Sequence, residues 1–567
     1  MLMGIFNGKT IKVSLLILFI LFFSFISFEI IKKSVDGKNN ILYKEKDISL
    51  TVDINKFHRD NSTIFLFKRL NYTPQRVIPF WFWNGNLSKK EITRQIELMQ
   101  STGIKEVIIH ARSGLVQEYL SEEWFEFVGH ALKELQKKDM KAWIYDEFDW
   151  PSGIANGKVL EKNPNLIAKN LKMKKMKNSN FSLPNTQFKA RKIVSVIFSN
   201  IDNTSNVKEK YCNNISCSFG EEYKNNSIYV FYQDYGHFKT EYKHHYYVDL
   251  MNPNATLNFI NLTHEEYYRR FPDHFGNTIV GFFTDEPGFY ANTYDIYDVG
   301  SIAWSNLFEK EFYEKKGYNI TNYVYYLWYD DEGNISEKVK RDYFEVRTDL
   351  YVENYFKTIH DWTSSHKVLL TGHVLIEENL YDIVNFEGDF FRTMEYLDIP
   401  GTDDIIYFDK NKITPILVSS AEFIYNKPYS LTETFAGYGW DLTYNKVIAT
   451  TNWLIENGVD IIVPHAFFYT TEGEIQYNDY PPSFFFQNQD LWTKIGEYIK
   501  HVNNKKNNKI TTPALVVYPL KKSWSLFDPI NRTEIEKIDY ELKSQIESLE
   551  KKGNSIILIP DYVFDKK

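Results

Sequence analysis

The sequence predicts an α/β protein built on a (β/α)8 TIM barrel, with a β-leaning insertion and the start of a second α/β domain at the C-terminus. Short apolar runs rich in β-branched and aromatic residues alternate with amphipathic helical stretches from about residue 77 onward. Eight such runs precede residue 505, which is the strand number of a closed barrel. With 567 residues, the chain is long enough to add further units to a barrel.

The N-terminal residues 1–33 have the pattern of a signal anchor or signal peptide. An apolar run from Val13 to Ile31 is flanked by Lys9 and Lys12 on one side and by Lys32 and Lys33 on the other. A run of this length can span a bilayer, and no small-residue cleavage site follows it. We therefore expect a single-pass membrane anchor or a secreted protein. Residues 34–75 are polar and are predicted to form an irregular linker or stalk.

The first three predicted strands cover 77–86, 104–114 and 141–153. An amphipathic helix over 88–103 separates the first two; Ser88 can cap its start, Glu91 stands three residues on, and Gly103 ends it. A second helix over 121–140 also begins with a serine. Strands that alternate with helices at this spacing indicate parallel βαβ units.

The alternation breaks near residue 160, and a Lys- and Asn-rich, β-leaning stretch to about residue 250 is interpreted as an insertion on the barrel. Five further strands are predicted at 277–287, 367–379, 396–404, 429–437 and 459–469, with helices at 341–365, 415–426 and 441–457. The predicted barrel spans 76–505. A doubly wound open sheet is the alternative fold. Such a fold typically has a Gly-rich, phosphate-binding turn after an early strand, and the sequence has none.

Residues 511–567 read as strand, charged helix and strand, which is a partial α/β domain. A unit of this size cannot bury both faces of its sheet by itself. We therefore expect it either to be the opening of a longer domain or to pack against the barrel.

The net charge limits the partners that the protein can have, and the glycosylation sequons indicate its cellular location. The net charge is −8, so no basic face is expected and nucleic acid is not a predicted partner. N-x-[ST] sequons occur twelve times, which favours a eukaryotic secretory route and a glycoprotein whose catalytic part lies outside the cytosol. They begin at Asn61, Asn71, Asn86, Asn180, Asn203, Asn214, Asn225, Asn254, Asn261, Asn319, Asn334 and Asn531. In an oxidising compartment, Cys212 and Cys217 could form a small disulfide.

Polar side chains collect at the predicted C-terminal ends of the strands, where barrel enzymes build their active sites. Glycoside hydrolysis needs two carboxyl groups that face each other across the scissile bond. Glu286 and Glu433, on the fourth and seventh strands, are the predicted catalytic pair. The predicted substrate-binding residues are Trp83, Asn84, His110, Arg112, Asp146, Glu147, Asp149, Trp150, Asp285, His373, Trp440 and His465.

Structural roles compete with each of these assignments. Glu286 could simply start a helix beside Pro287, and Glu433 could pair with a barrel arginine. The histidines could be satisfied core residues, and the tryptophans could serve core packing. No G-x-S-x-G elbow and no H-E-x-x-H pattern offers a stronger competing site.

Several motifs resemble glycoside hydrolase family 106, the α-L-rhamnosidases, and related (β/α)8-barrel glycosidases. They are PFWFWNG, IIHARSG, YDEFDWPSG, FTDEPG, TGHVLIEEN, LTETFAGYGWDLT and DYPPS, and they run in order over about residues 77–500. The resemblance implies a hydrolase that acts on plant or microbial oligosaccharides or polysaccharides and inverts the anomeric configuration. It further implies Glu286 as acid, Glu433 or Glu378 as base, and a calcium ion (Ca2+) near the substrate. No other cofactor is expected.

Two other functions remain open on the sequence. Strands four and seven also hold the carboxylates of retaining, β-galactosidase-like barrel hydrolases. A catalytically silent glycan-binding barrel is the third possibility, although such a protein would tolerate the loss of Glu286 and Glu433. The sequence thus predicts a glycoside hydrolase, with α-L-rhamnosidase-like activity as its first expectation.

Overall fold

The computed structural model describes residues 40–45, 48–53, 62–177, 180–183, 191–198, 206, 208–220, 226–235, 237–239, 244–290, 300–404, 413–436, 442–471, 490–505 and 513–564. The predicted membrane segment and Trp440 lie outside these residues. No helix within them has both the length and the apolar character needed to cross a bilayer.

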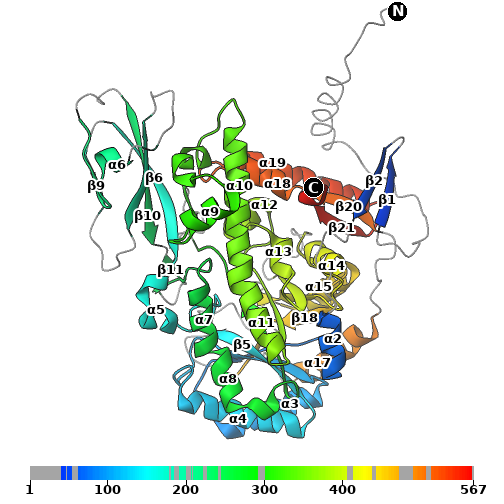
Figure 1. Cartoon of the computed structure of the whole chain (residues 1–567). Coiled ribbons are helices and arrows are strands. Elements are labelled where there is room, and N and C mark those ends of the chain that lie inside the picture. Colours follow the sequence, from blue (N-terminus) through cyan, green and yellow to red (C-terminus); the bar gives the residue numbers. More distant parts are fainter. Residues whose placement is uncertain are drawn as a thin grey trace, which may run out of the picture.

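A parallel barrel is the centre of the molecule, as predicted (Figure 1). Its strand order is β18-β17-β16-β15-β13-β5-β4-β3-β19, and β18 and β19 are two parts of the last predicted strand, so the sheet closes on itself. Each of the eight predicted strand regions contains part of this sheet. The strands are β3 (Phe80–Trp83), β4 (Glu106–Ala111), β5 (Lys141–Phe148), β13 (Ile279–Asp285), β15 (Leu369–His373), β16 (Ile399–Asp404), β17 (Leu431–Thr434), β18 (Ile461–Pro464) and β19 (Phe467–Phe468).

Two layers of apolar side chains hold the barrel because alternate residues of each strand face opposite sides. Phe80 and Phe82 of β3 point into the interior, where they meet residues such as Phe283. Trp81 and Trp83 point outward into the larger core between the sheet and the helices.

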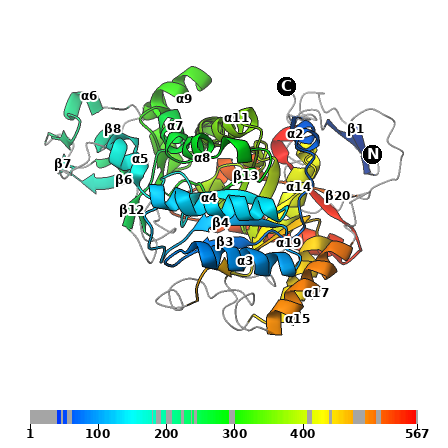
Figure 2. The same ribbon diagram turned by 90° about the horizontal axis from the view of Figure 1, so that it is seen from below.

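Helices cover the outside of the barrel, and Figure 2 shows α3 and α4 lying side by side against it. They are α3 (Lys89–Ser101), α4 (Glu122–Lys137), α7 (Pro253–Leu262), α8 (His264–Arg270), α14 (Thr414–Tyr425), α15 (Tyr444–Glu456) and α17 (Asp490–Asn504). Ser88 and Ser121 cap α3 and α4 by accepting hydrogen bonds from Glu91 N and Trp124 N, each at 3.2 Å.

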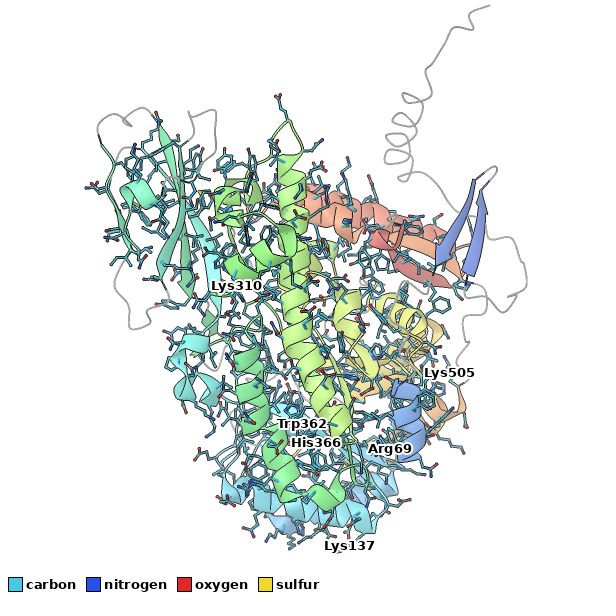
Figure 3. All side chains as sticks on the ribbon, viewed as in Figure 1. Arg69, Lys137, Lys310, Trp362, His366 and Lys505 are labelled. Carbon is cyan, nitrogen blue, oxygen red and sulfur yellow. A yellow bond between two sulfur atoms is a disulfide. The ribbon has the colours of Figure 1, made fainter. Side chains whose placement is uncertain are left out.

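The longest helical segment runs from α10 (Ile335–Tyr351) through a π-helical turn (Val352–Lys357) into α11 (Thr358–Ser365). Near its end, Trp362 and His366 stack with ring centroids 3.9 Å apart (Figure 3). Trp362 Nε1 also donates to Glu265 of α8 at 3.0 Å. This end of the segment is thereby fixed to the neighbouring barrel helix.

The insertion forms a separate four-stranded sheet in the order β14-β6-β10-β8 (Figure 1). Its strands are β6 (Lys169–Lys177), β8 (Lys192–Phe198), β10 (Ser227–Tyr235) and β14 (Ser301–Trp304). The last of these lies beyond the predicted limit of about residue 250. Cys212 and Cys217 of the insertion form the disulfide that the sequence suggested.

The segment 34–75 is more ordered than an irregular linker. It contains the antiparallel hairpin of β1 (Asn40–Glu45) and β2 (Ile48–Asp53) and the helix α2 (Ser62–Leu70). Leu66 and Phe67 of α2 are buried at the N-terminal end of the barrel, where they join the interior cluster. This helix was missed because its one apolar face is only two turns long.

The C-terminal unit packs on the barrel rather than standing alone. Its strands β20 (Ala514–Tyr518) and β21 (Ile556–Pro560) are parallel, with α18 (Leu520–Leu526) and α19 (Thr533–Glu550) between them. Ser420 of α14 accepts a hydrogen bond from Leu558 N, and Trp524 Nε1 donates to Gly388 O. The barrel therefore covers part of this small unit.

Candidate active site

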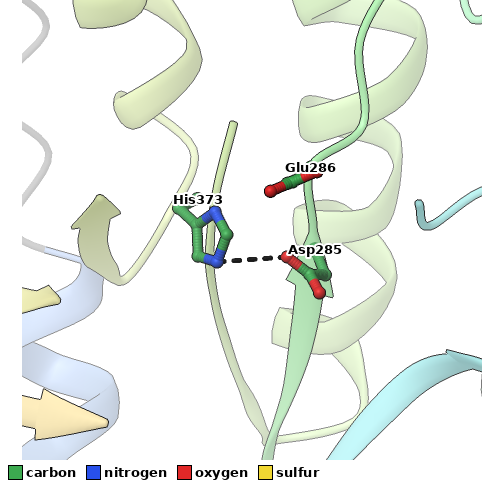
Figure 4. A group of neighbouring side chains, drawn as sticks. All are labelled: Asp285, Glu286 and His373. Atoms are coloured by element: carbon green, nitrogen blue, oxygen red, sulfur yellow. Dashed lines mark ion pairs between the residues drawn. The ribbon is translucent and has the colours of Figure 1, made fainter. Parts of the chain in front are cut away.

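Carboxyl and imidazole groups meet at the C-terminal ends of the barrel strands. Asp285 ends β13, Glu286 follows it, His373 ends β15, Glu433 lies in β17, and His465 follows β18. Figure 4 shows Asp285 and Glu286 side by side, facing His373 from the adjacent strand. All five were predicted site residues, and the fold brings them together from four strands.

Glu433 is held between two histidines. His373 Nε2 lies 2.8 Å from Glu433 Oε2, and His465 Nδ1 lies 2.9 Å from Glu433 Oε1. Burial alone would raise the pKa of Glu433, but these two hydrogen bonds outweigh it and lower the pKa to about 2. Glu433 is therefore an ionised carboxylate with both oxygens held in place.

His373 is shared between two acids. Its Nε2 is also 3.1 Å from Asp285 Oδ1. Burial opposes protonation of His373, yet the charges of Asp285 and Glu433 prevail and raise its pKa well above the ordinary value. A protonated His373 thus joins the two carboxylates. Tyr145, an inward-facing residue of β5, donates a short hydrogen bond to the other oxygen of Asp285.

Glu286 has the opposite electrostatic environment. Burial, followed by the negative charge of Asp285, raises its pKa well above the ordinary value, which favours a protonated carboxyl group. Its backbone adopts φ +47°, a conformation that non-glycine residues rarely take. Glu286 N donates to His373 O at 3.1 Å, and Glu286 O accepts from Tyr290 Oη at 2.7 Å. These bonds fix an unfavourable backbone conformation, as is frequent at functional sites.

Gly372 lets the two central strands approach closely beneath this site. It has φ +147°, and a Cβ there would lie 1.9 Å from the carbonyl oxygen of Thr284 in β13. Only glycine fits, and it directly precedes His373. The position of His373 against Asp285 therefore depends on this contact between β13 and β15.

His110 and Arg112 form the neighbouring wall of the barrel. The His110 ring is fully buried and stacks on Tyr145 with centroids 3.4 Å apart. Burial lowers its pKa well below the ordinary value, so the ring is neutral. Arg112 lies over the Phe82 ring and 3.7 Å from Asp149 Oδ1. The two side chains lie beside the carboxyl cluster rather than in it.

Three of the predicted substrate-binding acids have structural roles. Glu147 accepts hydrogen bonds from the backbone N–H groups of Phe148, Ile154, Ala155 and Asn156, and so fixes the loop after β5. Strand alternation points Asp146 away from the interior, where it accepts from Ser152 and lies 3.8 Å from the buried His264. Asp149 accepts from Ser113 N at 2.6 Å. The carboxyls of Glu147 and Asp149 are thus engaged by the protein, whereas one oxygen of Asp146 lacks a hydrogen-bond partner among the described residues. The assignment of the three acids to substrate binding remains a prediction.

Trp83 was predicted to bind substrate, but its side chain does not reach the barrel mouth. This residue is fully buried and packs against Trp124 of α4, on the helix side of the sheet. Asn84 exchanges two hydrogen bonds with the backbone of Thr470 at 2.8 and 3.0 Å, and thereby joins the end of β3 to the chain after β19. Trp150 is partly buried against the outer core. A strand end alone could not reveal which face each residue takes.

A second group of acids lies beyond β15 and β16, and sequence reasoning did not assign most of it. Glu387 and Glu377 are fully buried; both carboxylate oxygens of Glu387 and one of Glu377 have no hydrogen-bond partner among the described residues. Burial, then the charges of Glu377 and Glu378, raises the pKa of Glu387. Asp403 has a raised pKa for similar reasons. Asp403 was visible in the predicted strand 396–404, whereas Glu387 follows a helix and gave no signal.

Glu378, the alternative catalytic base, belongs to this second group. Burial raises the pKa of Glu378. Among the neighbouring charges, Asp382 raises this pKa further, whereas Lys543 and His373 lower it. Lys543 of the C-terminal unit donates to its backbone oxygen at 2.8 Å. Among the described residues, the histidine bonds at the site go to Glu433 and not to Glu378.

The calcium ion implied by the resemblance can be tested against these two groups. Asp285, Glu286 and His373 present ligand atoms within 4.8 Å of one another. Calcium prefers oxygen ligands, and His373 already contacts Glu433, so this trio fits calcium poorly. Glu377 and Glu387 have three buried carboxylate oxygens without a hydrogen-bond partner among the described residues, and oxygen is the ligand that a hard cation prefers. With a third described residue they form no cluster whose ligand atoms all lie within 4.8 Å of one another.

Comparison with known proteins agrees with the fold. No family model matches the chain. A protein of Formosa agariphila named "Putative beta-glucuronidase" is 21% identical over 427 residues; the match covers 64% of this chain but only 34% of that protein. The chain thus corresponds to about a third of this relative.

Solved structures of glycosidases superpose on most of the chain. A rhamnosidase from Novosphingobium sp. PP1Y matches with a TM-score of 0.53 and 11% identity, over 77% of this chain and 60% of that one. A β-galactosidase from the psychrophilic Marinomonas ef1 matches with a TM-score of 0.52 and 11% identity, over 86% of this chain and 70% of that one. At this identity the likeness shows the fold, and the chain has the (β/α)8-barrel fold found in these glycosidases.

Proposed function

We propose that this protein is a glycoside hydrolase in which Glu286 donates the proton to the leaving group and Glu433 is the ionised partner. One observation carries the proposal: at the barrel mouth Glu433 is hydrogen-bonded to His373 and His465, whereas Glu286 has no such partner among the described residues and lies beside Asp285. These surroundings shift the two pKa values in opposite directions. A hydrolase needs one carboxyl group protonated and the other ionised at the same pH. A silent glycan-binding barrel would gain nothing from this arrangement.

In this mechanism, Glu286 lies where burial and the charge of Asp285 keep its proton in place until the glycosidic oxygen takes it. Glu433 acts on the anomeric carbon directly as a nucleophile, or through a water molecule as a base. His373 and His465 orient its two oxygens. Asp285, bound by Tyr145 and His373, keeps His373 protonated and positioned.

The acidic surroundings support a neutral sugar as substrate. Asp285, Glu286, Glu433, Glu377 and Asp403 lie close enough for their charges to act on one another. A uronic acid would place a negative charge beside the ionised Glu433 and would raise the pKa values of the neighbouring acids further, which is unfavourable without a cation. We therefore place an α-L-rhamnoside first, in keeping with the motif resemblance, and a β-D-galactoside second, because a β-galactosidase superposes equally well.

Hydrolysis of a panel of aryl glycosides tests the proposal. The panel holds α-L-rhamnoside, β-D-galactoside and β-D-glucuronide, and the variants are Glu286→Gln, Glu433→Gln and, as an exposed control on α3, Glu97→Gln. We expect turnover of one neutral glycoside, which is lost in Glu433→Gln and kept in the control. In Glu286→Gln the turnover should fall by an amount that depends on how much the leaving group needs a proton. NMR of the first-formed anomer then separates the inverting from the retaining mechanism. Equal inertness of all four folded proteins would contradict a hydrolase.

We further propose that Glu377 and Glu387 hold the calcium ion that the resemblance implies. When bound, such an ion would neutralise these acids and orient sugar hydroxyls. Calcium should raise the melting temperature of the wild type, because a ligand that binds only the folded state stabilises it. The raised pKa keeps Glu387 protonated without calcium, so Glu387→Gln should melt close to the calcium-free wild type. It should lose the response to calcium, because an amide cannot supply the carboxylate ligand. An unchanged response in this variant would contradict the site.

A further inference from the structure

The described sequons lie on the surface of the folded chain. Nine of the twelve sequon asparagines lie in the described residues, and all nine are exposed: Asn71, Asn86, Asn180, Asn214, Asn254, Asn261, Asn319, Asn334 and Asn531. Asparagines outside sequons are not all exposed; Asn84 and Asn170, for example, are buried. A bulky, hydrophilic glycan requires an exposed position.

The side-chain nitrogen of each asparagine gives a second, independent observation. Nδ2 donates hydrogen bonds within the protein at six asparagines outside sequons: Asn84, Asn258, Asn354, Asn379, Asn457 and Asn554. At none of the nine sequon asparagines does Nδ2 donate to a described residue. The atom that would carry a glycan is thus available at every described sequon.

Two sequons have the best-defined local geometry. Asn319 Oδ1 accepts hydrogen bonds from Thr321 N at 3.0 Å and from Thr321 Oγ1 at 2.8 Å. Asn531 Oδ1 accepts from Thr533 N at 3.1 Å and from Thr533 Oγ1 at 2.7 Å. In both sequons the threonine hydroxyl donates to the asparagine Oδ1. The asparagine Nδ2 donates no hydrogen bond to a described residue.

The insertion provides a third observation. Asn214 lies inside the short loop that the Cys212–Cys217 disulfide closes. Disulfides persist in oxidising compartments, which are also the compartments where N-glycans are added. The disulfide and the sequons therefore point to the same cellular route.

We propose that this chain is an N-glycoprotein, modified at Nδ2 of the exposed sequon asparagines, with Asn319 and Asn531 as its principal sites. The donor would be a lipid-linked oligosaccharyl pyrophosphate. The bond between Nδ2 and the sugar C1 forms as the bond between C1 and the pyrophosphate oxygen breaks, and the amide loses one proton. None of the nine asparagines belongs to the carboxyl site, and Asn319 and Asn531 lie outside the loops that directly follow the barrel strands.

The full chain, with its own N-terminal residues, would be expressed in a eukaryotic cell and digested with peptide-N-glycosidase in water labelled with heavy oxygen. That enzyme converts a glycosylated asparagine into a labelled aspartate, which peptide mass spectrometry locates. We expect label at Asn319 and Asn531. Folded protein without label at either site would overturn the proposal, whether the chain stays in the cytosol or is exported.

Matched variants separate the sequon from its surroundings. Asn531→Gln and Thr533→Ala should each remove one glycan, seen as one step of increased gel mobility, whereas Thr533→Ser keeps the sequon and the glycan. Asn322→Gln, an exposed asparagine outside any sequon and three residues from Asn319, should change nothing. A glycan retained in both Asn531→Gln and Thr533→Ala would contradict the assignment of Asn531.

Discussion

Glu433 of β17 and His373 of β15 are hydrogen-bonded at 2.8 Å across the mouth of the barrel, although sixty residues separate them in the sequence. The histidine stabilises the ionised form of the glutamate, and Asp285 in turn stabilises the protonated histidine. Glu286 adjoins this charged group without an ion-pair partner of its own among the described residues. The two glutamates therefore differ in charge at the same pH.

The pH dependence of kcat/KM should be wide and extend far into the acid range. Activity needs ionised Glu433, whose pKa is lowered to about 2, so it should persist well below the ordinary glutamate value of 4.5. It also needs protonated Glu286, whose pKa is raised, so activity should fall as rising pH removes that proton. Circular dichroism at each pH would separate this loss from unfolding. An acid limb near 4.5 would argue against the role of the histidines.

Removal of one histidine should narrow this profile. His465→Phe keeps the ring shape among Phe82 and Phe468 but removes the hydrogen bond to Glu433. A hydrogen bond to a charged group contributes about 1.5–3 kcal/mol, so the acid limb should move upward by about one to two pH units. His465→Gln, which can still donate, should move it less. A wild-type profile in His465→Phe would show that His465 does not set the pKa of Glu433.

Glu147 should matter for stability rather than for chemistry. Its carboxylate accepts from four backbone N–H groups, one at the end of β5 and three in the loop that follows. Glu147→Gln turns one acceptor into a donor that faces these groups, and should lower the free energy of unfolding by about 2 kcal/mol or more. Thermal melts would measure the loss. A variant with wild-type stability but greatly reduced kcat would instead assign Glu147 to catalysis.

Gly372 should tolerate no side chain. In Gly372→Ala the added methyl group would overlap Thr284 O, so β13 and β15 must separate or the backbone must change. We expect a loss of about 3 kcal/mol in stability together with reduced kcat, because Asp285, Glu286 and His373 sit on these two strands. Gly553→Ala has no neighbour within 4 Å of the new Cβ but also has a positive φ, +78° against +147° at Gly372, so it measures the cost of a side chain at positive φ without a strand contact. Equal effects of the two changes would mean that strand contact is unimportant.

The sequence was sufficient for the barrel because its strands and helices carry strong, regular patterns. It was also sufficient to collect Glu286, Glu433, Asp285, His373 and His465, since C-terminal strand ends meet at one edge of a closed sheet. It could not show which side chains turn outward. Trp83 and Asp146 were therefore placed at the mouth, although both lie on the helix side.

Other features depend on contacts that no local pattern encodes. Glu387 reaches the acidic group from a helix end, and Tyr145 joins Asp285 from a neighbouring strand. The packing of α14 against β21 joins residues more than a hundred positions apart in the chain. Helix α2 has only one short apolar face, and its place beneath the barrel becomes clear only once the interior cluster is assembled.

The dependence of Glu286→Gln on the leaving group tests the central claim most directly. Wild type and variant would hydrolyse glycosides of the sugar selected by the panel, one with a dinitrophenyl leaving group and one with an alkyl leaving group. A dinitrophenolate departs without a proton, so the variant should remain close to wild type on it and lose about 10²–10⁴-fold in kcat/KM on the alkyl glycoside. Equal losses on both substrates would contradict Glu286 as the proton donor.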